Sequence, residues 1–340
     1  MKKIIYSALL FGSIYFISCR NQNEVKNEPI TKTENTKDSS FVVINQKIKN
    51  DIANPTLYIE RAKLYANRQD IPSALADVDR AIKLDSLKPE YYILKADYLL
   101  FQKKIAEVKE VLNTSLRLNP NNAETNLKLA EVSMFLRDNK QALEYINHVL
   151  KADAYNFQAY YMKGIIFMEN EDTLKAISSL QTAIEQNPDY YDAYIQLGVL
   201  FANKRNPLAK QYYLNALKLK PNSIEAMYNL GMYCQENNLF NEAIEFYNQI
   251  LIIDQHNALA YFNLGYLHLV QLHLLPEAVK YFSKAIEARS NYYEAYYNRG
   301  YAYELMKDWL NAETNYRQAL SIQPDYTLAA EGLGRVLEKK

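Results

Sequence analysis

Small apolar residues recur at a fixed spacing along most of the chain. Five of the eight glycines are separated by 34, 33, 34 and 35 residues, and alanines continue this spacing towards the N-terminus. The eight small residues are Ala62, Ala96, Ala130, Gly164, Gly198, Gly231, Gly265 and Gly300. Self-similarity with a period near 34 is typical of stacked helix–turn–helix units and is not expected of a single globular core.

Further apolar columns define two helices in each unit. A second small residue follows the first by about twelve positions, and a large apolar residue follows that by four. The large residues are Val78, Leu112, Ile146, Leu180, Tyr213, Tyr247, Phe282 and Tyr316. Offsets of three and four place these residues on one stripe of a helix, so each unit is predicted to contain two helices of about 14 residues. We expect the small residues where the two helices cross, because they let the backbones approach.

Prolines support this register. Nine of the ten prolines lie where a predicted helix begins or where a repeated segment ends. The tenth, Pro29, precedes the first repeated segment. Proline in the first turn of a helix costs no hydrogen bond, whereas proline in the interior breaks the helix. Two spacings are irregular, with one residue missing around 203–206 and one extra around 272–275. We assign both to turns, because loops tolerate insertions better than packed helices do.

The repeated pattern resembles the tetratricopeptide repeat, in which aromatic residues, glycine and alanine hold fixed places before a final proline. Residues 296–303, followed by Ala312, Tyr316, Ala319 and Pro324, match it best. The resemblance covers 55–326 and implies an all-α, right-handed α-solenoid. The eight predicted repeats are 55–88, 89–122, 123–156, 157–190, 191–223, 224–257, 258–292 and 293–326.

Helices are also predicted on both sides of the repeats. Leu328, Leu333 and Leu337 give residues 327–340 an apolar face, as expected of the capping helix that a solenoid needs at its end. Residues 41–54 form the matching N-terminal helix, with Ser39 or Ser40 as its cap.

The first 18 residues have the features of a secretory signal peptide. Lys2 and Lys3 precede an apolar run at 4–17 that is short for a membrane span. The junction before Cys19 resembles the bacterial lipoprotein processing site, although Phe16 stands where such sites usually carry Leu. This resemblance implies an acylated Cys19 and a lipoprotein of the bacterial cell envelope, facing the periplasm from the outer membrane. An uncut anchor and a plain signal peptide are the alternatives. The polar residues 19–40 are predicted to be a flexible tether.

Composition argues against several classes of function. Lys plus Arg and Asp plus Glu number 39 each, so the chain lacks the basic field that nucleic-acid binding requires. The four histidines show no helical zinc-site spacing, so no metal or cofactor is expected. The segment 332–334 lacks the third glycine of a dinucleotide loop, and we attribute its glycines to flexibility of the cap. Cys234, the only thiol left after cleavage before Cys19, is predicted to be a buried core residue. The chain is therefore expected not to be an enzyme.

The resemblance also predicts where a partner binds, because the first helices of such solenoids line a concave groove. Two rows on these helices, three before and one after the small residue, become apolar and aromatic in repeats four to eight. The predicted groove residues are Tyr161, Ile195, Tyr228, Met232, Phe262, Tyr266, Tyr297 and Tyr301. Contiguous apolar strips of this kind usually mark interaction sites. The alternative is that neighbouring repeats cover these side chains.

Asparagine occupies the row two before the small residue in three successive repeats, at Asn229, Asn263 and Asn298. This row resembles the ladder by which some family members hold the backbone of an extended peptide, since an amide can both donate and accept. The alternative is that asparagine only steadies its own helix. The basic clamp that grips a C-terminal carboxylate in chaperone-linked members is missing, since the rows contain only Lys63 and Lys128 as cations.

These observations predict a non-enzymatic, lipid-anchored adaptor that grips an extended segment or helix of a partner protein in its groove. The first alternative is a structural component of an envelope assembly or secretion machine, using other surfaces and associating with itself. The second is capture of a glycan or other small ligand by the groove tyrosines.

Overall fold

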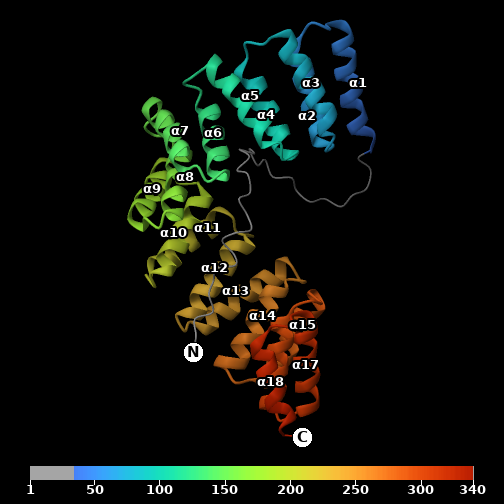
Figure 1. Ribbon diagram of the computed structural model, residues 1–340, viewed down its shortest axis with the longest axis vertical. Coiled ribbons are helices and arrows are strands. Elements are labelled where there is room, and N and C mark those ends of the chain that lie inside the picture. The colour runs from blue at the N-terminus through green and yellow to red at the C-terminus, as the bar shows by residue number, and fades with distance from the viewer. Residues whose placement is uncertain (1–33, 340) are drawn as a thin grey trace. The chain divides into compact units, whose positions relative to one another are not determined.

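The computed structural model describes residues 34–339, and every regular element in that range is a helix (Figure 1). The predicted signal peptide, Cys19 and most of the predicted tether lie outside the described residues. The chain divides after Gln186 into two compact units, each of which is described by itself. Within residues 34–339, no helix is both long enough and apolar enough to cross a bilayer.

The first unit is a single helix followed by four helix pairs. Its elements are α1 (Glu34–Asn50), α2 (Pro55–Asn67), α3 (Ile71–Leu84), α4 (Pro89–Phe101), α5 (Ile105–Leu118), α6 (Ala123–Phe135), α7 (Asn139–Ala152), α8 (Phe157–Glu169) and α9 (Thr173–Gln186). Ile44 and Ile48 of α1 are buried in a core with Tyr58, so α1 covers the first pair. This helix begins before the predicted boundary, and Ser39 and Ser40 therefore lie inside it and do not cap it.

The second unit contains four helix pairs and a final helix. Its elements are α10 (Tyr191–Asn203), α11 (Leu208–Leu219), α12 (Ile224–Glu236), α13 (Phe240–Ile253), α14 (Ala258–Tyr266), the π-helix η1 (Leu267–Gln271), α15 (Leu275–Ala288), α16 (Tyr293–Leu305), α17 (Trp309–Ile322) and α18 (Thr327–Leu337). The helices of each pair pack against each other, and the second helix of each pair packs against the first helix of the next.

Glycines lie where paired helices cross, as the sequence predicts. A Cβ atom on Gly231 would be 2.6 Å from the ring of Tyr247, and one on Gly198 would be 2.3 Å from the ring of Tyr213. Tyr247 is fully buried. The absence of a side chain at these crossings therefore makes room for the aromatic ring of the second helix.

Gly332 has the same role in the capping helix, so the prediction that it provides only flexibility is wrong. A Cβ atom at this position would be 2.5 Å from Tyr316 Cζ. Gly334, by contrast, has nothing within 4 Å that an added Cβ would meet. Gly332 thus lets α18 lie directly on the Tyr316 ring.

The turn inside each repeat has a constant geometry without glycine. One residue in each turn adopts a left-handed conformation with φ between 53° and 64°. These residues are Gln69, Lys103, Arg137, Glu171, Arg205, Asn238, His273 and Lys307. In the first repeat the next residue, Asp70, donates its backbone N–H to Tyr65 O, which closes α2. Its carboxylate accepts the backbone N–H of Ser73 and caps α3, so one residue serves both helices.

These left-handed residues locate the two irregular spacings. The missing residue of repeat five lies after Arg205, at the turn, near the predicted place. The extra residue of repeat seven lies before His273, within η1, so its assignment to the loop at 272–275 is wrong. A helix absorbs one residue by widening a turn, and the bond from Leu272 N–H to Leu267 O, five residues back, shows this widening.

Candidate partner-binding surface

The predicted groove residues are distributed over both units. Tyr161 lies on α8 of the first unit, and the other residues lie on α10, α12, α14 and α16 of the second. Tyr161, Ile195 and Asn263 are buried, at 7%, 3% and 6% exposure. The remaining predicted residues are half-buried. We call the half-buried row one position after each small residue of the second unit the first-helix row; its members are Val199, Met232, Tyr266 and Tyr301.

Residues three positions before the small residue pack between repeats. The Phe262 ring stacks on Tyr292, with ring centroids 5.0 Å apart, and meets the edge of Phe282 at 5.7 Å. The Tyr297 ring lies 5.4 Å from Tyr326 at an interplanar angle of 84°. The second helix of the repeat and the turn that leads to the next repeat therefore account for much of the burial of Phe262 and Tyr297.

Sequence reasoning missed the partners of these rings. Tyr292 and Tyr326 immediately precede α16 and α18, in the turns that link one repeat to the next. The repeated columns read from the sequence cover helical positions only and include no position in these turns. The tyrosine at the same place in both turns was a visible signal.

The first-helix row is less completely covered. Tyr301 lies parallel to Tyr297, with an interplanar angle of 2° and ring centroids 6.4 Å apart, and keeps part of its surface accessible. Met232 and Tyr266 are also partly accessible on α12 and α14. This row presents apolar and aromatic surface on consecutive first helices, and such side chains are enriched at the centres of interfaces.

Two of the three asparagines bond to their own helices. Asn263 donates Nδ2–H to Leu259 O at 3.0 Å, and its side chain also forms a hydrogen bond with Tyr228. Asn298 donates Nδ2–H to Glu294 O at 2.8 Å. Asn263 therefore uses its amide nitrogen within the protein, and this residue steadies α14. Asn229 is half-buried, and in the described part of the chain its side chain does not donate to the backbone carbonyl four residues earlier.

One position after the small residue, the first helices of repeats one to three carry charge, at Lys63, Asp97 and Glu131. Lys128 is 7% exposed, and its Nζ lies 2.5 Å from Asp97 Oδ1, so this cation already has a counter-ion. Burial raises the pKa of Glu131 to about 7, although the charge of Lys128 opposes this shift. Lys63 is exposed on α2. Lys128 therefore cannot act freely as a clamp for a carboxylate.

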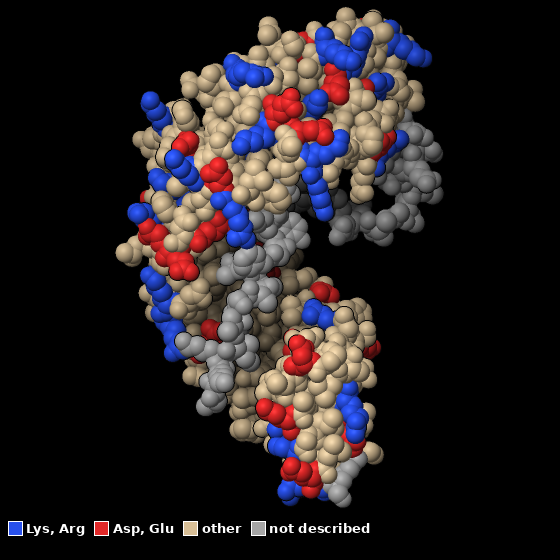
Figure 2. Space-filling model, viewed as in Figure 1, with Lys and Arg blue, Asp and Glu red and all other residues tan. Residues whose placement is uncertain are grey.

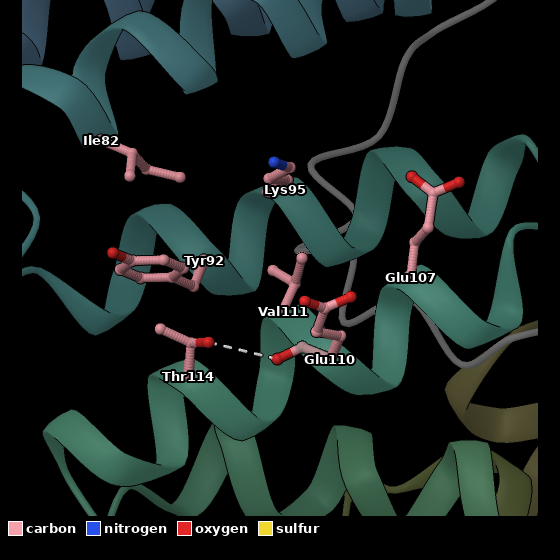
Figure 3. Close-up of a pocket in the computed structure, with 7 residues that line it drawn as sticks. All are labelled: Ile82, Tyr92, Lys95, Glu107, Glu110, Val111 and Thr114. Carbon is pink, nitrogen blue, oxygen red and sulfur yellow. Dashed lines mark hydrogen bonds between the residues drawn. The ribbon is translucent and has the colours of Figure 1, made fainter.

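A surface pocket of about 270 Å³ lies between α3, α4 and α5 (Figure 3). Ile82 enters it from α3, Tyr92 and Lys95 from α4, and Glu107, Glu110, Val111 and Thr114 from α5. Lys95 is held by Asp79 at 2.7 Å. The seven lining residues contain no histidine, cysteine or serine.

Other chemical features of the described residues are structural. Residues 34–339 contain no group of three His, Cys, Asp or Glu side chains placed to hold a metal ion. Cys234 is fully buried, as predicted, and burial raises the pKa of its thiol to about 11. A thiol in this state is a poor nucleophile at neutral pH. Figure 2 shows acidic and basic side chains interspersed over the visible face.

Family models described as "Tetratricopeptide repeat" match several segments of the chain. One model matches residues 89–122, a second matches 127–191, 161–223 and 199–258, and a third matches 293–326. No curated protein sequence matches the chain.

Several solved structures share the fold. The C-terminal part of a TPR repeat-containing protein from Cytophaga hutchinsonii is 22% identical, with a TM-score of 0.60, over 71% of this chain and 99% of that one. A tetratricopeptide repeat protein from Parabacteroides merdae is 17% identical, with a TM-score of 0.51, over 73% and 98%. The Cut9–Hcn1 heterotetramer of the APC/C contains a chain that is 18% identical, with a TM-score of 0.53, over 89% of this chain and 58% of that one.

Proposed function

Because the chain belongs to the tetratricopeptide repeat family, whose members generally bind protein or peptide partners, we propose that it is a non-enzymatic adaptor. The proposed partner element is an extended segment or a helix of another protein. The first-helix row of the second unit supports this proposal, because its accessible apolar and aromatic side chains follow one another on consecutive repeats. Apolar surface presented in this way is a common mark of interaction sites.

The asparagine ladder has a smaller part in this proposal than the sequence suggested. Asn263 is 6% exposed and donates its Nδ2–H to Leu259 O, so little of this side chain is available to hold a peptide backbone. Asn229 and Asn298 keep side-chain atoms that a partner could use. We therefore assign affinity mainly to Met232, Tyr266 and Tyr301.

The experiment is affinity capture from detergent-solubilised cells, with quantitative mass spectrometry of the captured proteins. The variant Met232→Ser/Tyr266→Ser should lose the specific partners while keeping the melting temperature close to that of the unchanged chain. The matched control is Ile252→Ser, at a side chain that is 79% exposed on α13. Full partner capture by the double variant would overturn the proposal, as would equal loss by the control.

We further propose that Cys19 is acylated and anchors the protein in the bacterial cell envelope, in the outer membrane and facing the periplasm. The basic start, the apolar run and the small residue before Cys19 support this proposal. Metabolic labelling with an alkyne fatty acid should mark the protein, and Cys19→Ser should abolish the label. Persistence of the label in Cys19→Ser would contradict the assignment.

A further inference from the structure

The turns inside repeats seven and eight expose a group of large apolar side chains. We call this group the turn edge; it consists of Val270, Leu272, Leu274, Leu305, Met306 and Leu310. These side chains are 36–67% exposed, and they lie in the turn between the two helices of a repeat or in the helical residues that flank it. Each of these two turns exposes three large apolar side chains, whereas the described turns of the other repeats expose at most two, such as Phe135 and Leu136.

The π-helix η1 builds much of this edge. Its Leu267 and Leu269 are buried at 0% and 2% exposure, and it packs against α13 and α15. The residues that follow are then directed outward, so that Val270, Leu272 and Leu274 are exposed together. The exposed group is therefore held by a packed element and does not result from a frayed helix end.

The chemistry beside the turn edge fits the surface of a bilayer. Trp309, the single tryptophan of the chain, is half-buried next to Leu310, and tryptophan is enriched at membrane–water interfaces. Lys307 is exposed within the same turn, while the neighbouring Asp308 carboxylate accepts the backbone N–H of Asn311 at 3.2 Å. Glu304, near the edge, is held by Arg335 at 2.7 Å. Asp308 and Glu304 thus already have partners within the protein, whereas Glu277 in the first turn of α15 is exposed.

We propose that the turn edge docks on a lipid bilayer, with its aliphatic side chains entering the interface and Trp309 at headgroup depth. The orientation rests on the proposed anchoring at Cys19. Residues 20–33 separate that cysteine from α1, so the anchor would hold the start of the repeats within about 50 Å of the membrane. Five of the six side chains of the edge are Leu or Val, and these residue types are under-represented among the residues that dominate protein–protein binding.

Trp309 provides the test without a label. The chain from residue 19 with Cys19→Ser, which has no lipid attachment site, is mixed with phosphatidylcholine vesicles, with and without phosphatidylglycerol. Brominated acyl chains should quench the Trp309 fluorescence, and the protein should sediment with the vesicles. Because the edge is mainly apolar, binding should persist on the neutral vesicles. Leu272→Ser/Leu274→Ser should lower the partition coefficient at least tenfold.

The matched control is Ile252→Ser/Ile253→Ser, which removes the exposed apolar side chains of the last two residues of α13, just before the turn that links two repeats. This control should bind vesicles like the unchanged chain. Absence of quenching, or equal loss in both variants, would overturn the proposal. A concentration-dependent dimer that Leu272→Ser/Leu274→Ser disrupts would instead assign the edge to a second copy of the chain. Failure of the Cys19 label would leave this result unaffected, so the two proposals can fail separately.

Discussion

At the scale of single residues, the fold depends on matching sizes at each helix crossing. Glycine faces an aromatic ring in the pairs Gly198–Tyr213, Gly231–Tyr247 and Gly265–Phe282. In the first repeats, where the small residue is alanine, the large one is aliphatic: Ala62 shares a core with Val78, and Ala96 with Leu112. A smaller residue on one helix is thus compensated by a larger one on the other, which keeps the interior filled.

Replacing a crossing glycine should separate its helices. Gly231→Leu would force the Tyr247 ring out of its place, and we expect a loss of about 1–3 kcal/mol or more in the free energy of unfolding. Urea and thermal denaturation would measure this loss. Gly334→Leu is the control, because nothing lies within 4 Å of a Cβ atom there. A Gly231→Leu protein as stable as the control would show that the assigned helix crossing is wrong.

These crossings could be predicted because both residues recur in every repeat. The contact of Gly332 could not be predicted in this way, because Gly332 lies in the capping helix and no repeat has an equivalent residue. Its partner, Tyr316, already lies against Gly300, with 3.1 Å between a ring atom and an added Cβ. The contribution of Gly332 became visible only when α18 was seen lying on the same ring.

At the scale of helices, one arginine position links neighbouring elements in the first and last repeats. Arg61 on α2 donates from Nε and Nη2 to the carboxylate of Asp77 on α3, both at 2.7 Å. Arg299 on α16 donates to Asn315 on α17 at 2.8 Å and to Ser283 on α15 at 2.9 Å. Burial lowers the pKa of Arg299, since no carboxylate supports its charge.

Asn315→Asp should reproduce in the last repeat the ion pair of the first. Asn315 is 5% exposed and already accepts from Arg299 Nε, so a carboxylate there would form an ion pair with the guanidinium, although it would lose the Nδ2–H bond to Asn311 O. We expect a gain of about 1–2 kcal/mol in the free energy of unfolding, measured in urea. Asp77→Asn should show the opposite change. A loss of stability in Asn315→Asp would mean that desolvation of the new carboxylate outweighs the ion pair.

Glu131 on α6 should make the first unit less stable as pH rises. Burial raises its pKa to about 7, above the ordinary value of 4.5, although Lys128 opposes this shift and Asp97 adds to it. The protonated form therefore supports folding below pH 4.5, and this contribution is lost as pH rises through 7. We expect Glu131→Gln to gain about 1–3 kcal/mol at pH 8 and nothing near pH 4. Parallel urea midpoints for both proteins between pH 4 and 8 would contradict this expectation.

At the scale of the whole chain, the sequence predicted the register better than the binding surface. Periodicity identifies columns such as Gly231 with Tyr247, because packing within a repeat is the same each time. It does not show which columns neighbouring repeats cover, so Phe262 and Met232 looked alike although only the first stacks in a repeat boundary. The π-helix before His273 was also hidden, because an inserted residue has the same sequence signature in a helix as in a loop.

The contact that holds the capping helix should be lost in acid and should act locally. Arg335 of α18 donates Nε–H and Nη2–H to Glu304 at 2.7 and 2.9 Å, and Tyr316 donates its hydroxyl to the same carboxylate. Burial would raise the pKa of Glu304, but these hydrogen bonds outweigh it and lower the pKa. The contribution is thus present above the ordinary carboxyl pKa and lost as pH falls through the lowered value.

Arg335→Gln should therefore loosen α18 at neutral pH. Arg335 is 48% exposed, so solvent screening limits the loss in free energy of unfolding to about 1 kcal/mol or less. Each repeat contacts only its neighbours, so amide hydrogen exchange should accelerate in α17 and α18 and stay unchanged in α2 to α5. Faster exchange throughout both units would show that the chain unfolds as one cooperative block, and stability would then not be a sum over neighbouring repeats.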